Sequence, residues 1–582
     1  MRRRFASFAC IGFLFGLFQL TGRELARQGN IIWNGTYTWG ILLGSLLIAL
    51  SVGLAACFLP RAVGQITRGL SRLTRWERLP RFMQLLRFMP SKQREDSHVG
   101  ERGGSKVGSI WVWLISAGLI ALCWLPAYLA YYPGICAYDV TVQTGQIENH
   151  AYNDHHPIAH TLLLEGSMRL GAAVFGDSNT GLACLVLLQM LCLAAALAWG
   201  IALLYRRGVG KGFLLCLQAI GMFYPFHWYM SVSVSKDIFF TVFFMIQVIS
   251  LCETLRRGKT AFDRYDGLFI VSGVGMQLFR TNGRYAMLVL AVFLCAALAL
   301  GRGRRRFWGK LCIGCAVSLL VGSLSLSALF RVTGAEQGDR REMLSLPIQQ
   351  FARCMLYHGG VGELPEDDGT MEAQDKELID AFLLDEGYRE YRPEISDPVK
   401  RHTNTYVARY RAGDFVRTYL HLLTQYPGDF INAGLAVNAG YLYIGDESHA
   451  LINQNGIDKG LGYVQTRWVN DELNPRGLYQ ASKWETLHGW LESWADKNAY
   501  LRLPVIRYLF VPGTFLWLYL LLAGRLIERK CYARCIPLTL ILGYYLTLLL
   551  GPTVQLRYIY PLMTVLPYMA LMLLTGERDG SK

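Results

Sequence analysis

The chain has 582 residues, of which 52% are hydrophobic and 17% are charged, and its mean hydropathy is +0.25. Soluble domains carry about 25% charged residues, so the composition excludes an ordinary soluble enzyme. Disordered and collagen-like chains are less apolar, and 14 cysteines in a chain of this length do not make a disulfide-rich miniprotein. The composition therefore predicts a polytopic membrane protein of the all-α class.

The net charge of +15 is unevenly distributed along the chain. Residues 331–500 carry 17 Lys and Arg against 26 Asp and Glu, so the rest of the chain holds the positive excess. There the basic residues gather in short loops between apolar runs, which is typical of cytoplasmic loops that face an anionic membrane surface. A nucleic-acid-binding protein would instead need a basic stripe on a folded soluble domain, so we expect membrane lipids and no nucleic acid as partners.

Apolar runs of about 20 residues are needed to cross a bilayer as helices. The sequence predicts about twelve transmembrane helices, at roughly 5–20, 39–59, 109–130, 180–204, 212–230, 237–254, 266–279, 285–300, 310–330, 502–523, 536–551 and 558–574.

The basic loops fix the expected orientation of these helices. We expect loops such as Arg206-Arg207 and Arg256–Lys259 to face the cytoplasm. If Ile158–Phe175 also crossed the bilayer, every later basic loop would face outward. We therefore interpret that segment as an amphipathic helix that lies on the outer surface, with Glu165 and Arg169 interrupting its apolar run. Both termini are then expected in the cytoplasm.

Five regions follow from these expectations. They are two transmembrane helices in 1–60, a basic amphipathic cytoplasmic linker in 61–108, a transmembrane core in 109–330 whose first exported loop is 131–179, a large and mainly helical extracytoplasmic domain in 331–500, and transmembrane helices with a short cytoplasmic tail in 501–582.

The first exported loop carries polar residues close to a span end. Asp139 follows a Pro-Gly turn a few residues after the expected helix 109–130, and Asp154, His155 and His156 precede the surface helix. Asp139 is either a functional carboxylate at the mouth of the bundle or a helix-capping residue. His155, His156 and His160 are metal ligands or, equally, phosphate or pocket contacts, because a closed metal site needs further ligands that the sequence does not place.

Four cations lie in other short connections that are expected on the outer side. Lys236 precedes Asp237, Arg280 and Arg284 flank Asn282, and Arg557 precedes Tyr558. Positive charge outside opposes the usual loop bias, which indicates either function or interfacial anchoring.

An acid and several cations at an outer membrane mouth suit the transfer of a sugar from a polyprenyl-phosphate carrier. Cations stabilise the charge that develops on the leaving phosphate, and a carboxylate can deprotonate the acceptor hydroxyl. Asp139 is the expected base, and Lys236, Arg280, Arg284 and Arg557 are the expected phosphate contacts.

The same residues resemble the GT-C superfamily of integral-membrane glycosyltransferases, which includes protein O-mannosyltransferases and the aminoarabinose transferases of lipid A. The motifs look most like those of an uncharacterised bacterial membrane family assigned to that superfamily, over roughly 109–575. They are Tyr132-Pro133-Gly134 with Asp139, His155-His156-Pro157, Lys236-Asp237, Phe279–Gly283, Leu346–Gln350 and Arg557-Tyr558.

The resemblance implies a GT-C-like enzyme of the bacterial plasma membrane. It would act on the outer face, taking a polyprenyl-phosphate-linked sugar to a glycan, lipid or protein of the cell envelope. The expected catalytic residues are Asp139, Asp154, His155 and His156. Tyr132, Tyr138, Gln143, Asp237, Asn282, Gln349 and Tyr558 are the expected further pocket residues.

Metal dependence stays open at this point. The superfamily often has an acidic pair in or after its first loop, whereas the neighbour of Asp139 is Tyr138, so Asp154 or Asp237 would supply the second carboxylate. Magnesium or manganese is the candidate ion.

A transporter or flippase for a lipid-linked or anionic precursor is the alternative. It would explain twelve spans, but transporters usually have paired halves with charged residues near the membrane midplane. Here the expected charges cluster at the outer helix ends, and the sequence contains no second copy of the Asp139 region.

Overall fold

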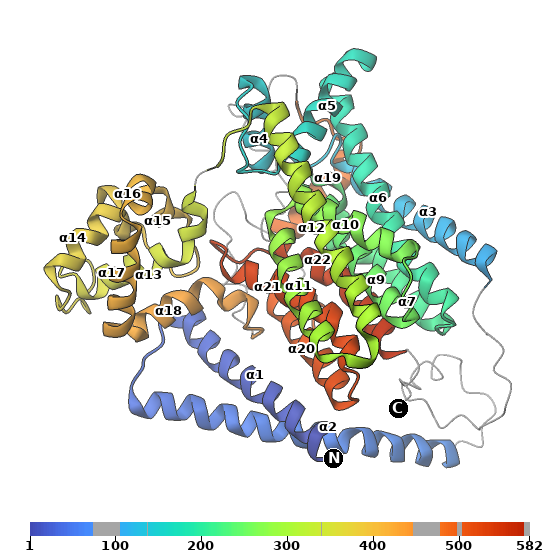
Figure 1. The fold of residues 1–582 in the computed structure, drawn as a ribbon, viewed down its shortest axis with the longest axis horizontal. Helices are drawn as coiled ribbons and strands as arrows, with labels where there is room; N and C mark the ends of the chain where they lie inside the picture. Colours follow the sequence, from blue (N-terminus) through green and yellow to red (C-terminus); the bar gives the residue numbers. More distant parts are fainter. Residues whose placement is uncertain (74–104, 137, 339, 446–477, 497–502, 576–582) are drawn as a thin grey trace.

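A computed structural model describes the chain except for residues 74–104, 137, 339, 446–477, 497–502 and 576–582. All regular elements among the described residues are helices, and extended segments meet only at isolated β-bridges. The expected all-α class is thereby confirmed for this part of the chain. Figure 1 shows a central bundle, an N-terminal hairpin of two long helices along one side, and a group of short helices beside them.

The central bundle is built from two stretches of the chain. The first contributes α3 (Lys106–Ala130), α4 (Tyr138–Asn149), α5 (Ile158–Phe175), α6 (Ser178–Arg206), α7 (Lys211–Phe223), α8 (Pro225–Val232), α9 (Lys236–Arg257), α10 (Arg264–Phe279), α11 (Thr281–Leu300) and α12 (Arg305–Thr333). The second contributes α19 (Glu485–Asp496), α20 (Pro512–Glu528), α21 (Ile536–Leu549) and α22 (Leu556–Leu574). Local signals begin several of these helices: Ser105, Asp177 and Ser235 accept bonds from the first-turn amides of α3, α6 and α9.

Nine of the described helices are long and apolar enough to cross a membrane. They are α1, α2 as far as Phe58, α3, α6, α9, α11, α12, α21 with its preceding turn, and α22. Helices α9 and α22 are largely buried inside the bundle, whereas α3 and α12 expose most of their apolar side chains. Such exposure suits a lipid environment.

Three of the twelve expected spans form helices that are too short to meet this criterion. The segment expected at 212–230 divides into α7 and α8, because Pro225 lacks an amide proton and begins a new helix. Helix α10 has 16 residues, and α20 has 17 because Pro512 delays its start. Their lengths of about 24–26 Å fall below the thickness of the hydrocarbon layer, so the expected count of twelve becomes nine by this criterion.

Two expectations for the loops have different outcomes. Helix α5 has the expected bounds, between Pro157 and the left-handed Gly176. Glu165 is buried within it and accepts a hydrogen bond from Tyr152 at 2.8 Å. Most of the expected linker 61–108 lies outside the described residues, although α2 continues to Leu73.

The group of short helices has its own core. It contains α13 (Ser345–His358), α14 (Ala373–Phe382), α15 (Asp397–Arg401), α16 (Thr405–Tyr410), α17 (Ala412–Gln425) and α18 (Pro427–Asn438). Phe351, Phe382 and Phe415 form its centre, with ring centroids 4.9–6.1 Å apart. This group, here called the outer helical group, occupies part of the region expected to be exported, whose boundaries remain a prediction.

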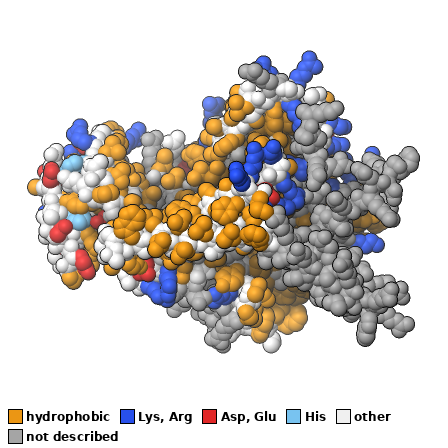
Figure 2. Space-filling view, turned by 90° about the horizontal axis from the view of Figure 1, so that it is seen from below, with side chains coloured by type: hydrophobic (Ala, Val, Ile, Leu, Met, Phe, Trp, Pro, Cys, Tyr) orange, Lys and Arg blue, Asp and Glu red, His pale blue; other side chains and the backbone are white. Residues whose placement is uncertain are grey.

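The N-terminal hairpin joins the bundle to the outer helical group. It consists of α1 (Arg2–Gln28) and α2 (Gly35–Leu73). Phe15 of α1 meets Trp517 of α20 edge to face at 5.0 Å, and the hairpin turn reaches α18, where Trp33 donates to Asn432 at 3.0 Å. Apolar side chains form a continuous band on the face seen in Figure 2. Exposed residues of α2 such as Trp39 and Leu43 make this helix suitable for contact with lipid.

Candidate functional site

A short backbone pairing aligns the loop before α4 with the start of α9. The amide of Ile135 donates to the carbonyl of Val232, and the amide of Val234 donates to the carbonyl of Ile135, both at 2.9 Å. Gly134 permits this approach because its φ is +152°, and a Cβ there would lie 2.6 Å from Val186 Cγ2. The pairing brings the residues that follow each segment toward the same point.

Helix α9 begins at this point with two charged residues, Lys236 and Asp237. The Ser235 hydroxyl accepts a hydrogen bond from the backbone amide of Asp237 at 3.1 Å and so caps the helix. Lys236 and Asp237 therefore occupy the first turn, where the helix dipole favours the Asp237 carboxylate. Asp237 is fully buried.

Asp139, in the first turn of α4, contacts two cations from distant segments. Its Oδ2 accepts from Lys236 Nζ at 3.0 Å and from Arg557 Nη1 at 2.8 Å. Lys236 also donates to His156 Nδ1 at 2.8 Å. Arg557 begins α22, and its Nε donates to Gln555 Oε1 at 3.0 Å, which orients the guanidinium.

The second carboxylate, Asp237, lies between two guanidinium groups. Its oxygens are 3.3 Å from Arg280 Nη1 and 3.5 Å from Arg557 Nη1. Arg280 also donates to the Tyr544 hydroxyl at 2.8 Å. The ring of Tyr558 lies beneath both guanidiniums, 4.7 Å from Arg280 and 4.9 Å from Arg557, and so holds them in place by cation–π contact.

Asp139, Lys236, Asp237, Arg280 and Arg557 are called the charged cluster below. Three cations and two carboxylates leave it with one excess positive charge, in a site where both carboxylates and both arginines are buried. Such a site attracts an anion and disfavours a divalent cation. The residues around Asp139 therefore do not fit the magnesium or manganese ion that the sequence left open.

The protonation states follow from the surroundings. Burial alone would raise the pKa of the Asp139 carboxyl, but the Arg557 and Lys236 charges hold that pKa well below its ordinary range. Burial and Lys236 lower the pKa of His156 well below its ordinary value, so this imidazole is neutral. Asp139 is thus a carboxylate whose basicity the cations suppress.

Gln143 belongs to a buried chain of hydrogen bonds next to the cluster. Its amide nitrogen donates to Thr161 Oγ1 at 2.9 Å, and its oxygen lies 3.1 Å from Nδ1 of His160. His160 is fully buried, and burial lowers its pKa to about 4. His160 is one of the histidines for which the sequence left a metal, phosphate or pocket role open, and it lies in the first turn of α5.

Asp154 and Arg284 lie apart from these contacts, and His155 reaches them only through its ring, which meets the His156 ring edge to face with centroids 4.6 Å apart. Asp154 and His155 are exposed, and Asp154 accepts a hydrogen bond from the amide of Gly338 instead of meeting Asp139. Arg284 lies in the first turn of α11, where its Nε is buried with no hydrogen-bond partner among the described residues. Their expected catalytic and phosphate-binding roles stay predictions.

The remaining expected pocket residues make other contacts. Asn282 donates to Thr547 at 2.8 Å, Gln349 donates to the carbonyl of Arg392, and the Tyr132 ring lies 4.7 Å from Lys483 Nζ. Tyr138 begins α4, but its side chain lies outside the described part.

Two residues of the site were not expected from the sequence. Tyr544 lies inside an apolar run, and Gln555 lies in a short polar turn, so neither has a distinguishing local pattern. Only the fold brings them to the arginines.

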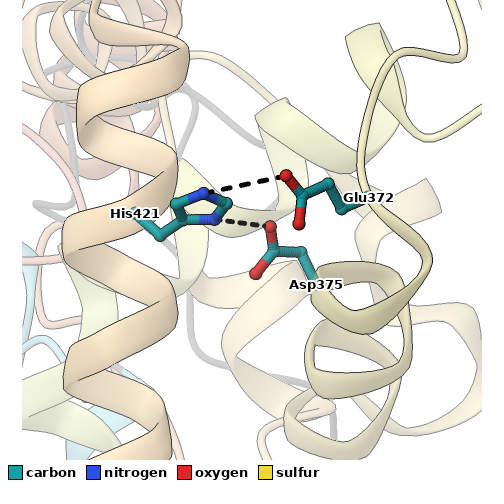
Figure 3. A group of neighbouring side chains, drawn as sticks. All are labelled: Glu372, Asp375 and His421. Carbon is teal, nitrogen blue, oxygen red and sulfur yellow. Dashed lines mark hydrogen bonds and ion pairs between the residues drawn. The ribbon is translucent and has the colours of Figure 1, made fainter.

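A separate group of possible metal ligands lies in the outer helical group (Figure 3). Ligand atoms of Glu372, Asp375 and His421 lie within 4.8 Å of one another. His421 Nδ1 is 2.8 Å from Asp375, and its Nε2 is 4.0 Å from Glu372. Because one imidazole already joins both carboxylates, the group serves equally to connect α14 and α17, and it belongs to a different helical group from the charged cluster.

Comparison with known proteins gives a family and no function. No curated protein and no solved structure matches the chain. A family described as being of unknown function, DUF6020, matches residues 147–582. This range includes Lys236, Asp237, Arg280 and Arg557 but begins after Asp139. Since the match covers most of its length, the chain belongs to the DUF6020 family.

Proposed function

We propose that the protein is a GT-C-like glycosyltransferase of the bacterial plasma membrane, which moves a sugar from a polyprenyl-phosphate carrier to an extracytoplasmic acceptor. The observation that carries this proposal is the contact of Asp139 with both Lys236 and Arg557, which joins a suppressed base to two phosphate-binding cations. The acceptor would be a glycan, lipid or protein of the cell envelope.

The charge of the cluster suits this donor. A sugar linked to a lipid by one phosphate is a phosphodiester with one negative charge, which matches the single excess positive charge of the cluster. A diphosphate-linked donor would bring more negative charge than the cluster neutralises. The match therefore favours a monophosphate carrier.

The same contacts couple donor binding to the basicity of Asp139. A phosphate that binds Lys236 and Arg557 shares the charges that hold the pKa of Asp139 down, so that pKa rises when the donor is bound. Asp139 then takes the proton of the acceptor hydroxyl, whose oxygen forms the new bond to the anomeric carbon. The bond from that carbon to the phosphate oxygen breaks, and its electron pair leaves with the lipid phosphate.

Cations contribute most at that last step. The leaving phosphate gains negative charge as the bond breaks, and Lys236, Arg280 and Arg557 are held in position by hydrogen bonds or aromatic contact. Preorganised charges of this kind stabilise the transition state more than the bound donor.

The course of the chain supports twelve passes. Lys236, Arg280 and Arg557 meet at one end of the bundle, so α9, α11 and α22 all leave from that end. At the other end, Arg207 after α6 pairs with Glu253 of α9. The broken helix α7–α8 and the short α10 therefore return the chain along the bundle despite their lengths. With α20 also crossing, α1 begins and α22 ends at the end of the bundle opposite the cluster, which is the side expected to be cytoplasmic.

Ion pairs at that opposite end favour an enzyme over a transporter. Arg207 contacts Glu253 at 2.7 Å, and Lys310 contacts Asp266 at 2.9 Å, with all four side chains buried. Alternating access would have to open this end and separate both buried charge pairs. A transferase needs only the end that holds Asp139 to open.

The test is sugar transfer by the purified full-length protein in liposomes. Donors would be polyprenyl-phosphate esters of radiolabelled glucose, mannose and aminoarabinose, with an envelope extract as acceptor. Asp139→Asn should abolish transfer yet retain donor binding, because the cations remain. Asp380→Asn, the same change at an exposed position of α14, is the matched control. Full activity of Asp139→Asn would refute the assignment of the base.

A further inference from the structure

Two buried imidazole nitrogens next to the charged cluster have no partner among the described residues. They are Nε2 of His156 and Nε2 of His160. The side chains are 4% and 0% exposed, respectively. Buried polar atoms are nearly always hydrogen-bonded in folded proteins, so these two atoms beside one site are available to a ligand or to water.

The partner of His156 determines which of its nitrogens carries the proton. An ammonium group has three donors and no acceptor, so Lys236 must donate to Nδ1 at 2.8 Å. The proton of the neutral imidazole is then on Nε2. His156 therefore presents a buried N–H donor with nothing to accept it.

His160 has the opposite arrangement. Thr161 Oγ1 lies near the carbonyl of Pro157, to which it donates, and it accepts from the amide nitrogen of Gln143. The amide oxygen of Gln143 then faces His160 Nδ1 at 3.1 Å and accepts its proton. His160 therefore presents a bare Nε2 lone pair, which accepts a hydrogen bond.

Together the two nitrogens require a ligand with one acceptor and one donor. A phosphate oxygen accepts, and the charged cluster that His156 joins through Lys236 attracts such an anion. A sugar hydroxyl donates, and the sugar is attached to that phosphate in the donor lipid.

We propose, resting on the proposed function, that His156 donates to the donor phosphate and His160 accepts from a hydroxyl of the transferred sugar. His160 is then a specificity-determining residue that distinguishes a glycosylated carrier from the bare lipid phosphate. When the bare lipid phosphate binds, the lone pair of His160 Nε2 stays without a donor. The affinity for this product is therefore lower than for the donor, which favours release of the product.

The experiment compares binding of two kinds of probe to the full-length protein in nanodiscs. The probes are decaprenyl phosphate and its glucosyl, mannosyl and aminoarabinosyl esters. The wild-type protein should prefer at least one ester over the bare phosphate. His160→Phe should weaken binding of that ester by about three- to tenfold, which corresponds to the loss of one hydrogen bond. Its affinity for the bare phosphate should stay within about twofold of the wild-type value. His160→Gln, whose amide oxygen can accept, should restore part of the preference.

His156→Phe distinguishes the phosphate contact from the sugar contact. Because every probe carries a phosphate, this variant should bind all probes more weakly, by a similar factor. The inference is refuted if the wild-type protein binds bare phosphate as tightly as every ester, or if His160→Phe weakens bare phosphate as much as the preferred ester. In both cases Asp139-dependent transfer would still stand. If the wild-type protein binds none of the probes, the proposed function fails as well. Melting temperatures of the variants establish that they are folded.

Discussion

His160 links the candidate site to the stability of the protein. It is buried as a neutral imidazole with a pKa of about 4, and it faces Lys236, Asp237 and Asp139. An unfolded histidine titrates near pH 6.5. Between about pH 4 and pH 6.5, therefore, this histidine is protonated in the unfolded chain and neutral in the folded protein. Stability from this group is therefore complete above pH 6.5 and is lost as the pH falls toward 4, by up to about 3 kcal/mol.

We therefore expect the melting temperature of the wild-type protein in detergent to fall between pH 7 and pH 5. The variant His160→Gln removes the titrating group while keeping an amide that can hydrogen-bond to Gln143, so its fall should be smaller. Exposed His155→Gln is the matched control and should keep the wild-type slope. A variant His160→Gln with an unchanged slope would show that another group governs the acid sensitivity.

The sequence predicted the basic residues of the charged cluster better than it predicted the residues that contact them. Lys236, Arg280 and Arg557 could be predicted because each follows or precedes an apolar run, on the side that is expected to be extracytoplasmic and where positive charge is unusual. The direction of the Asp154 side chain could not be predicted, because closeness to His156 in the sequence does not determine where a side chain points. In the structure it points toward the amide of Gly338. Tyr544 could not be predicted, because a tyrosine in an apolar helix looks the same whether its hydroxyl meets an arginine or lipid.

At the scale of elements, the pairing between Ile135 and Ser233 sets the distance between α4 and α9. Gly134 allows it through a φ of +152° and the absence of a Cβ near Val186. Gly134→Ala should therefore displace the start of α4, lengthen the contact of Asp139 with Lys236, and reduce transfer by tenfold or more, since about 1.4 kcal/mol corresponds to a factor of ten.

The control is Gly145→Ala, within α4, where an added Cβ meets nothing within 4 Å. That variant should retain activity and gain slight helix stability. Donor binding, transfer and melting temperature are measured for both. Wild-type activity in Gly134→Ala would mean that the backbone pairing does not determine the position of Asp139.

Helix boundaries were predictable where a strong local signal stands at each end. Pro157 and Gly176 enclose α5, whose bounds agree with the sequence. Pro225 carried the signal that divides α7 from α8, but hydropathy averaged over a window conceals a single break. The docking of the hairpin on the outer helical group had no sequence signal, because Arg353 and Asn30 are 323 positions apart and meet at 2.7 Å only in the folded chain.

At the scale of the whole molecule, the number of passes decides on which side the site lies. Twelve passes place both termini at the end opposite the charged cluster, whereas nine would place them on opposite sides of the membrane. The ends of the bundle can be labelled separately. Ala151 is exposed between α4 and α5 on the side of the cluster, and Thr260 is exposed in the turn after α9 on the other side.

We expect a membrane-impermeant maleimide to label Ala151→Cys in intact spheroplasts. Thr260→Cys should react only after the membrane is opened, because basic loops such as the one with Arg256 and Arg257 favour the cytoplasmic side. The wild-type protein, with its own 14 cysteines, gives the background for each condition. Labelling of both variants from outside would mean that the two ends of α9 share one side, which the path of the chain through Lys236 and Arg257 does not allow. Labelling of Thr260→Cys alone would place Asp139 in the cytoplasm, where a sugar nucleotide rather than a lipid-linked sugar would be the available donor.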